Sequence, residues 1–217
     1  MKILTVAVGR PRDVAGPRPG ETTSTAIWKE PVAGPVEVGP ENLVGDEQAD
    51  RRNHGGPEKS VYAYGEEDLA WWRAELGGID DLVFGQNLTT AGRDLRDARI
   101  GERWRIGTAE LEVVQPRIPC FKLGMRAGDP TMPRRFVAAD RPGVYLRVTR
   151  TGTITAEDTV DVTDGPDGAP TVAEVFGIYH HHRDRAARLL DAPGLPSWYH
   201  EWARKRLGSG ERRLSRD

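Results

Sequence analysis

The apolar runs in this sequence are short, and 25 glycines and 16 prolines separate them along most of the chain. Short apolar runs separated by glycine and proline are typical of many short strands joined by turns. We therefore predict a mainly β fold with a few helices. The expected strands cover residues 3–8, 25–29, 36–38, 104–106, 108–114, 144–149 and 158–162. Residues 10–20 read as a loop, and residues 151–152 as a hairpin turn.

One long helix is predicted over residues 66–76. Three acidic residues lie in its first turn, where they complement the helix dipole, and Gly77 and Gly78 follow its end. Leu69, Trp72 and Leu76 recur at helical spacing, so Trp72 is expected in the core. A shorter helical turn is expected at residues 134–139.

The C-terminal part of the chain predicts a separate helical unit. A Gly/Pro-rich linker covers residues 165–170, and Thr171 and Glu174 then form a capping box. Further helices are expected at residues 183–190 and 197–207, with 208–217 frayed. We predict two domains, 1–165 and 166–217. Because the second is too small for a large core of its own, we expect it to pack on the first or on a partner chain.

The totals limit the kind of protein. The 31 Lys and Arg nearly balance the 33 Asp and Glu, so we expect no nucleic-acid partner. No apolar run of about 18 residues exists, and the first residues do not resemble a signal peptide, so we expect no membrane. A single cysteine excludes an intrachain disulfide and fits a reducing compartment. These features predict a soluble protein of the cytoplasm.

That cysteine, Cys120, lies in the segment Q-P-R-I-P-C-F-K-L at 115–123. Pro116 and Pro119 restrict the backbone before it. The nearby cations Arg117 and Lys122 favour a thiolate over a thiol. An inert cysteine buried among apolar side chains is the competing interpretation. If the segment is simply extended, Arg117 and Cys120 point to opposite faces.

Two other polar segments are candidate binding sites. His54 precedes Gly55 and Gly56 in the first, and Lys59 and Ser60 follow; a solvated loop explains this pattern equally well. In the second, Gly85 precedes amide and hydroxyl side chains, which suits either close approach of the backbone to a ligand or a turn with local hydrogen bonds. The three histidines at 180–182 point in different directions on a helix, so we expect no metal site there.

Together these segments resemble the YiiM-type proteins of the MOSC domain family. The matching motifs are G-D-E-Q-A-D at 45–50, H-G-G-P-E-K at 54–59, G-Q-N-L-T at 85–89 and the segment around Cys120. Their order and spacing match as well, and the similarity covers about residues 1–207. The resemblance implies a distorted, mostly antiparallel β-barrel followed by a three-helix domain. One departure is Gln86, where the family pattern has glutamate; we expect it to change the tuning of the site or the local structure rather than cofactor binding.

The resemblance also implies a function. Relatives such as the mitochondrial amidoxime-reducing component bind the molybdenum cofactor in its molybdopterin form and reduce N-hydroxylated compounds, including hydroxylaminopurines. Cys120 would then be the thiolate ligand of molybdenum. The candidates to bind the pterin and its phosphate are Asn87, Thr89, His54, Lys59, Arg117 and Gly85. His54 or Asp50 would relay protons during N–O cleavage.

Three functions remain open from the sequence. The first is a reductase of small N-hydroxylated molecules. It would receive electrons from a separate redox protein, since the chain has no flavin, haem or iron–sulfur motif; pyridoxal phosphate is not expected either. The second is a protein that carries the molybdenum cofactor or sulfur without turnover. The third is a cofactor-free thiol enzyme in which His54 serves Cys120 as base. A homodimer is compatible with each.

Overall fold

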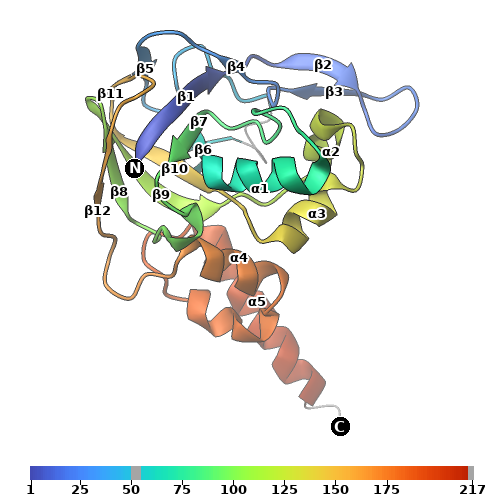
Figure 1. Ribbon diagram of the computed structural model, residues 1–217. Coiled ribbons are helices and arrows are strands. Elements are labelled where there is room, and N and C mark those ends of the chain that lie inside the picture. Colours follow the sequence, from blue (N-terminus) through green and yellow to red (C-terminus); the bar gives the residue numbers. More distant parts are fainter. Residues whose placement is uncertain (50–54, 215–217) are drawn as a thin grey trace.

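A computed structural model describes residues 1–49 and 55–214, with side chains as far as residue 208. Its main element is an eight-stranded sheet, in which every neighbouring pair is antiparallel except the parallel pair β6–β7 (Figure 1). In spatial order the strands are β12 (Val160–Thr163), β8 (Arg103–Ile106), β9 (Ala109–Pro116), β10 (Val144–Arg150), β6 (Val61–Gly65), β7 (Leu88–Ala91), β1 (Lys2–Val8) and β4 (Glu30–Pro31). The mostly antiparallel sheet expected from the sequence is confirmed.

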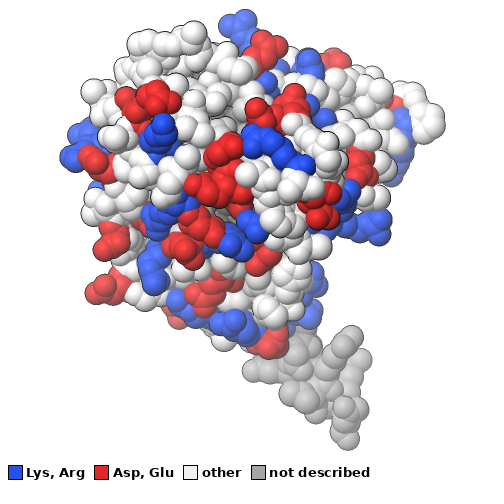
Figure 2. Space-filling view, viewed as in Figure 1, with Lys and Arg blue, Asp and Glu red and all other residues white. Residues whose placement is uncertain are grey.

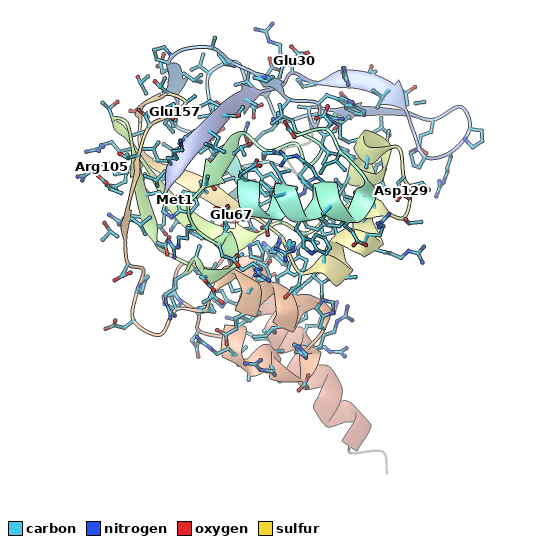
Figure 3. All side chains as sticks on the ribbon, in the orientation of Figure 1. Met1, Glu30, Glu67, Arg105, Asp129 and Glu157 are labelled. Atoms are coloured by element: carbon cyan, nitrogen blue, oxygen red, sulfur yellow. The ribbon has the colours of Figure 1, made fainter. Side chains whose placement is uncertain are left out.

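The sheet curls until β1 meets the segment that leads into β12, but it does not close into a barrel. The Ile3 N–H donates to the Asp158 carbonyl and the Val160 N–H to the Met1 carbonyl, both at 2.9 Å, around one isolated bridge between Lys2 and Thr159. The pairing between β1 and the residues before β12 does not continue, because farther along the same edge of β1, Ala7 and Val8 pair with β4. Glu157, labelled in Figure 3, lies at this seam, where its carboxylate pairs with Lys2 at 3.1 Å. The distorted, mostly antiparallel barrel implied by the resemblance is thus present as a curled sheet that stays open at this seam.

Two small sheets lie beside the main one. β2 (Arg12–Ala15) and β3 (Thr22–Thr25) form a hairpin where a plain loop was expected, and the strand predicted at 25–29 ends at Thr25. β11 (Gly152–Ile154) pairs with β5 (Val36–Val38), so the predicted hairpin at 151–152 is wrong. Gly152 allows this path because a Cβ there would lie 2.5 Å from the backbone nitrogen of Ala109.

The helix predicted over 66–76 is confirmed as α1 (Glu66–Leu76), and Gly77 ends it in the left-handed conformation. α3 (Met132–Ala139) begins two residues before the predicted turn, whereas α2 (Phe121–Ala127) was not predicted. Short 3-10 turns occur at η1 (Pro57–Lys59) and η2 (Leu95–Asp97). Trp72 is buried, as expected, in an aromatic core under α1 where Tyr64 stacks on Phe84 with 4.4 Å between ring centroids.

Of the C-terminal helices α4 (Val172–His180), η3 (Arg183–Leu189) and α5 (Ser197–Leu214), α4 packs against the sheet, η3 packs on α4, and α5 packs on η3 (Figure 1). Thr171 caps α4, since its hydroxyl accepts the Glu174 N–H at 3.1 Å. The other half of the capping box is replaced by an ion pair, because the Glu174 carboxylate accepts from Arg188 at 3.1 Å. The second predicted helix is 3-10, and α5 continues to Leu214 instead of ending near 207.

Val172, Val175 and Ile178 of α4 belong to the same apolar core as the sheet. Packing on the strand-rich part, one of the two arrangements expected, is therefore present, while the division at residue 165 stays a prediction. His180 at the end of α4 does not act as a dipole-stabilising cation: burial, with His181 and Arg183 nearby, lowers its pKa to about 4.

Basic and acidic side chains are interspersed over the face shown in Figure 2. Within the part of the chain that the structure describes, no helix has the length and apolar character needed to cross a membrane.

Candidate functional site

A pocket lies where the ends of several strands meet the loops that follow them. It encloses about 620 Å³, counted out to its open mouth. Its walls come from the segment after β3, the loop before residue 50, η1, β6, the turn before β7, the β9–α2 junction and β10. The lining residues are Thr25, Ala26, Ile27, Lys29, Asp46, Glu47, Gln48, Ala49, Lys59, Tyr62, Gly85, Asn87, Arg117, Cys120, Lys122 and Tyr145.

Cys120 reaches this pocket because the chain changes direction around it. β9 ends at Pro116, Cys120 keeps an extended backbone (φ −131°, ψ 177°), and α2 begins at the next residue. The cysteine is half-buried. The turn between β9 and α2 brings Arg117 and Cys120 to the same pocket, so the opposite-face geometry of a fully extended segment does not occur.

Arg117 is a buried cation in the pocket wall, with 6% of its surface exposed. Its guanidinium lies 4.9 Å from the ring centroid of Tyr62 and donates to the Phe84 carbonyl. Burial opposes its charge, but Tyr62, Tyr145 and Cys120 outweigh that effect and raise the guanidinium pKa. Among the described residues no carboxylate forms an ion pair with it. A buried guanidinium of this kind is suited to an anionic ligand.

Other polar groups complete the wall. Lys122, on the first turn of α2, is 8% exposed, and no described carboxylate pairs with it. Tyr62 and Tyr145 lie with ring centroids 5.0 Å apart, and burial raises the pKa of each phenol, which keeps both neutral. Lys29 forms a buried ion pair with Asp46. The pocket therefore combines one soft sulfur with an excess of positive charge.

Gly85 and Asn87 line the pocket as predicted, and both have structural roles there. Gly85 has φ +64°, and a Cβ on it would lie 2.6 Å from Cγ1 of Ile27. The Asn87 amide joins two strands, since its Oδ1 accepts the Tyr62 N–H and its Nδ2 donates to the Ala7 carbonyl, both at 3.1 Å.

Thr89 is not among the residues that line the pocket, and its role toward a cofactor stays a prediction. The Thr89 hydroxyl accepts from Gln86 Nε2 at 3.3 Å, and the same nitrogen donates to the Asp81 carbonyl at 2.6 Å. Gln86 is fully buried away from the pocket. This position fits the expectation that the departure from glutamate affects local structure.

Lys59 lies in the pocket, at the end of η1. Its carbonyl accepts from Gln48 Nε2 at 3.1 Å, and Gln48 Oε1 accepts the Gly56 N–H at 2.9 Å. Asp50 and His54 lie outside the described residues. Lys29, Tyr62 and Tyr145 were not predicted as pocket residues, because a side chain at a strand end carries no periodic signal that distinguishes a pocket from the core.

Comparisons with known proteins identify the family of this chain. Residues 50–161 match the MOSC domain. The chain belongs to the MOSC domain family. The YiiM protein of Escherichia coli is 30% identical over 195 residues, which cover 86% of this chain and 87% of that protein. The crystal structure of YiiM from Geobacillus stearothermophilus has a TM-score of 0.79 and 30% identity, covering 95% of this chain and 98% of that one. The chain is a YiiM-type MOSC protein.

A further relative is a Gibberella moniliformis protein named "Reductase", 36% identical over 199 residues. The match covers 89% of this chain but only 35% of the fungal protein, so this MOSC protein spans about a third of that relative's length.

Protein groups alone do not form a metal centre in the described part of this MOSC protein. No three His, Cys, Asp or Glu side chains there are grouped to hold an ion. Among the described residues, Cys120 is therefore not part of a group of three such side chains.

Proposed function

We propose that this MOSC protein binds the molybdenum cofactor in its molybdopterin form, with the Cys120 thiolate as the protein's ligand to molybdenum. The observation that carries the proposal is that the chain's only cysteine lies in the same pocket as the buried cations Arg117 and Lys122. Neither cation has a described carboxylate partner. Thiolate is a soft ligand that suits a metal held by sulfur. An anionic cofactor would satisfy charges that are costly to bury alone.

The residues divide into two roles under this proposal. Arg117, Lys122 and Lys59 provide donors for the anionic parts of the cofactor. Gly85 and Asn87 shape the wall, since Gly85 lets Ile27 approach and Asn87 fixes the strands on both sides. The roles of His54 and Asp50 as proton relays stay predictions.

We further propose that the protein reduces small N-hydroxylated compounds to amines. When bound, the cofactor supplies two-electron chemistry at molybdenum. The protein's part is to hold the substrate in a pocket with one open mouth and to place proton donors there. A fungal relative named "Reductase" supports the reaction class. With one cysteine and no flavin or haem motif, the chain would receive electrons from a separate redox protein.

The test uses protein produced in a host that makes the cofactor. We expect near-stoichiometric molybdenum by elemental analysis and reduction of a hydroxylaminopurine with an artificial electron donor. Cys120→Ala should lose the metal and keep the fold, as judged by circular dichroism.

Each other outcome is informative. Full molybdenum content in Cys120→Ala would overturn the ligand assignment. Bound metal without reduction would favour a carrier, and cysteine-dependent turnover without metal would favour a thiol enzyme.

A further inference from the structure

The Lys29–Asp46 ion pair is the most deeply enclosed charged pair in the pocket wall among the described residues. The two side chains are 8% and 4% exposed, and both line the same pocket as Cys120. An exposed ion pair contributes little to stability, and a buried one is costly unless its geometry is well fixed. The position of this pair, inside a candidate active site, calls for a chemical explanation.

Two hydrogen bonds fix Asp46. The Gly9 N–H donates to Asp46 Oδ1 at 2.7 Å, and the Asp46 carbonyl accepts from Asn42 Nδ2 at 2.7 Å. Gly9 also allows the Lys29 segment to approach, because a Cβ on Gly9 would lie 2.7 Å from the Trp28 carbonyl oxygen and 3.0 Å from Lys29 Cδ. One residue thus orients the carboxylate and makes room for the lysine.

The surroundings make Lys29 a better acid than an exposed lysine. Burial lowers its pKa, the Arg117 charge lowers it further, and the Asp46 carboxylate opposes both. The other charged or titratable groups of the described pocket wall are Glu47, Lys59, Tyr62, Cys120, Lys122 and Tyr145. Arg117 keeps its proton at all working pH values, so it cannot serve as an acid.

We propose that Lys29 is a proton donor of the reaction and that Asp46 is its positioning residue. This inference rests on the proposed function. Reduction of an N-hydroxylated compound breaks the N–O bond and consumes two electrons and two protons, giving an amine and water. The separate redox protein would supply the two electrons. Lys29 Nζ gives one proton to the departing oxygen and is reprotonated from solvent, and solvent supplies the second proton to nitrogen.

The first test needs no cofactor. NMR titration of the lysine side chains in cofactor-free protein, with Lys29 assigned from Lys29→Arg, should show Lys29 titrating below the other lysines. Asp46→Asn removes the charge that opposes this shift, so it should move the Lys29 titration to still lower pH. Ordinary titration of Lys29, or an upward shift in Asp46→Asn, would overturn the proposal.

The second test uses the loaded enzyme. Lys29→Arg keeps the positive charge but removes the acid, so molybdenum content should stay at the wild-type level while turnover falls about 100-fold or more, as general acid catalysis predicts. The decline of the wild-type rate with rising pH should disappear in the variant. Wild-type turnover in Lys29→Arg would overturn the role of Lys29 as a proton donor and leave the proposed function standing. Loss of molybdenum from the Lys29→Arg protein would assign Lys29 to cofactor binding instead. An inactive, metal-free wild type would instead overturn the proposed function.

Discussion

Arg117 is buried in the pocket wall with no described carboxylate beside it. Burying that charge is costly, and the hydrogen bond to the Phe84 carbonyl and the Tyr62 ring, 4.9 Å from the guanidinium, offset part of the cost. We infer that the arginine is kept for an anionic ligand rather than for stability. Binding and stability should therefore respond to its loss with opposite signs.

We predict that Arg117→Met lowers bound molybdenum at least 10-fold, while the cofactor-free protein stays as stable as the wild type or becomes more stable. The reason is that methionine fills a similar volume without a buried charge. Elemental analysis and thermal unfolding of the cofactor-free protein measure the two effects.

Arg126→Met is the matched control. Arg126 pairs with Asp80 at 2.7 Å away from the pocket, so this variant should lose some stability and keep its molybdenum. A marked loss of stability in cofactor-free Arg117→Met would contradict our interpretation of the buried charge.

For single residues, the sequence predicted part of the site. Cys120, Arg117 and Lys59 stand in motifs with a recognisable order, and the structure places all three in the pocket. The sequence did not point to Lys29, because nothing local shows that Asp46, 17 residues later, lies against it. The sequence also did not show that the Thr89 hydroxyl accepts a hydrogen bond from Gln86.

Among the elements, the junction of β9 and α2 was the least predictable. α2 has only seven residues and contains Gly124, which is a poor helix former. Gly124 is needed for tertiary reasons, because a Cβ there would lie 3.0 Å from the Asp129 carbonyl oxygen. Local propensity therefore argued against the helix that brings Lys122 to the pocket. α1 was predictable because its acidic first turn and Gly77 cap are local signals.

The turn before β7, which contains Gly85, gives a prediction about a single structural element. Gly85→Ala should lower the free energy of unfolding by more than about 2 kcal/mol, because left-handed backbone strain of roughly 1 kcal/mol adds to a collision with Ile27. Gly128→Ala is the control, with nearly the same φ (+66°) and no atom within 4 Å of the new Cβ. It should cost only about 1 kcal/mol. If urea unfolding showed the same loss of stability in Gly85→Ala and Gly128→Ala, the close approach of Ile27 to residue 85 would not contribute to the effect.

Over the whole molecule, one apolar core runs from the curled sheet into the C-terminal helices. The sequence marked the helical unit through its linker and capping box, but these local signals say nothing about what the helices contact. The structure adds that backbone hydrogen bonds also cross the boundary, from Ile100 N–H to the Pro170 carbonyl at 3.0 Å and from Val172 N–H to the Ala98 carbonyl at 2.8 Å. We infer that the helices and the sheet unfold together.

Val175→Ala tests this inference. Val175 is fully buried in the shared core, so the variant should lose about 2 kcal/mol of stability, through lost apolar contact and the cavity left behind. Far-ultraviolet circular dichroism and tryptophan fluorescence should give one coincident transition, displaced equally for both probes. Val162→Ala, at a 38% exposed position on β12, should change stability by less than about 0.5 kcal/mol. A separate early transition of the helical signal in Val175→Ala would mean that residues 166–217 unfold as an independent domain.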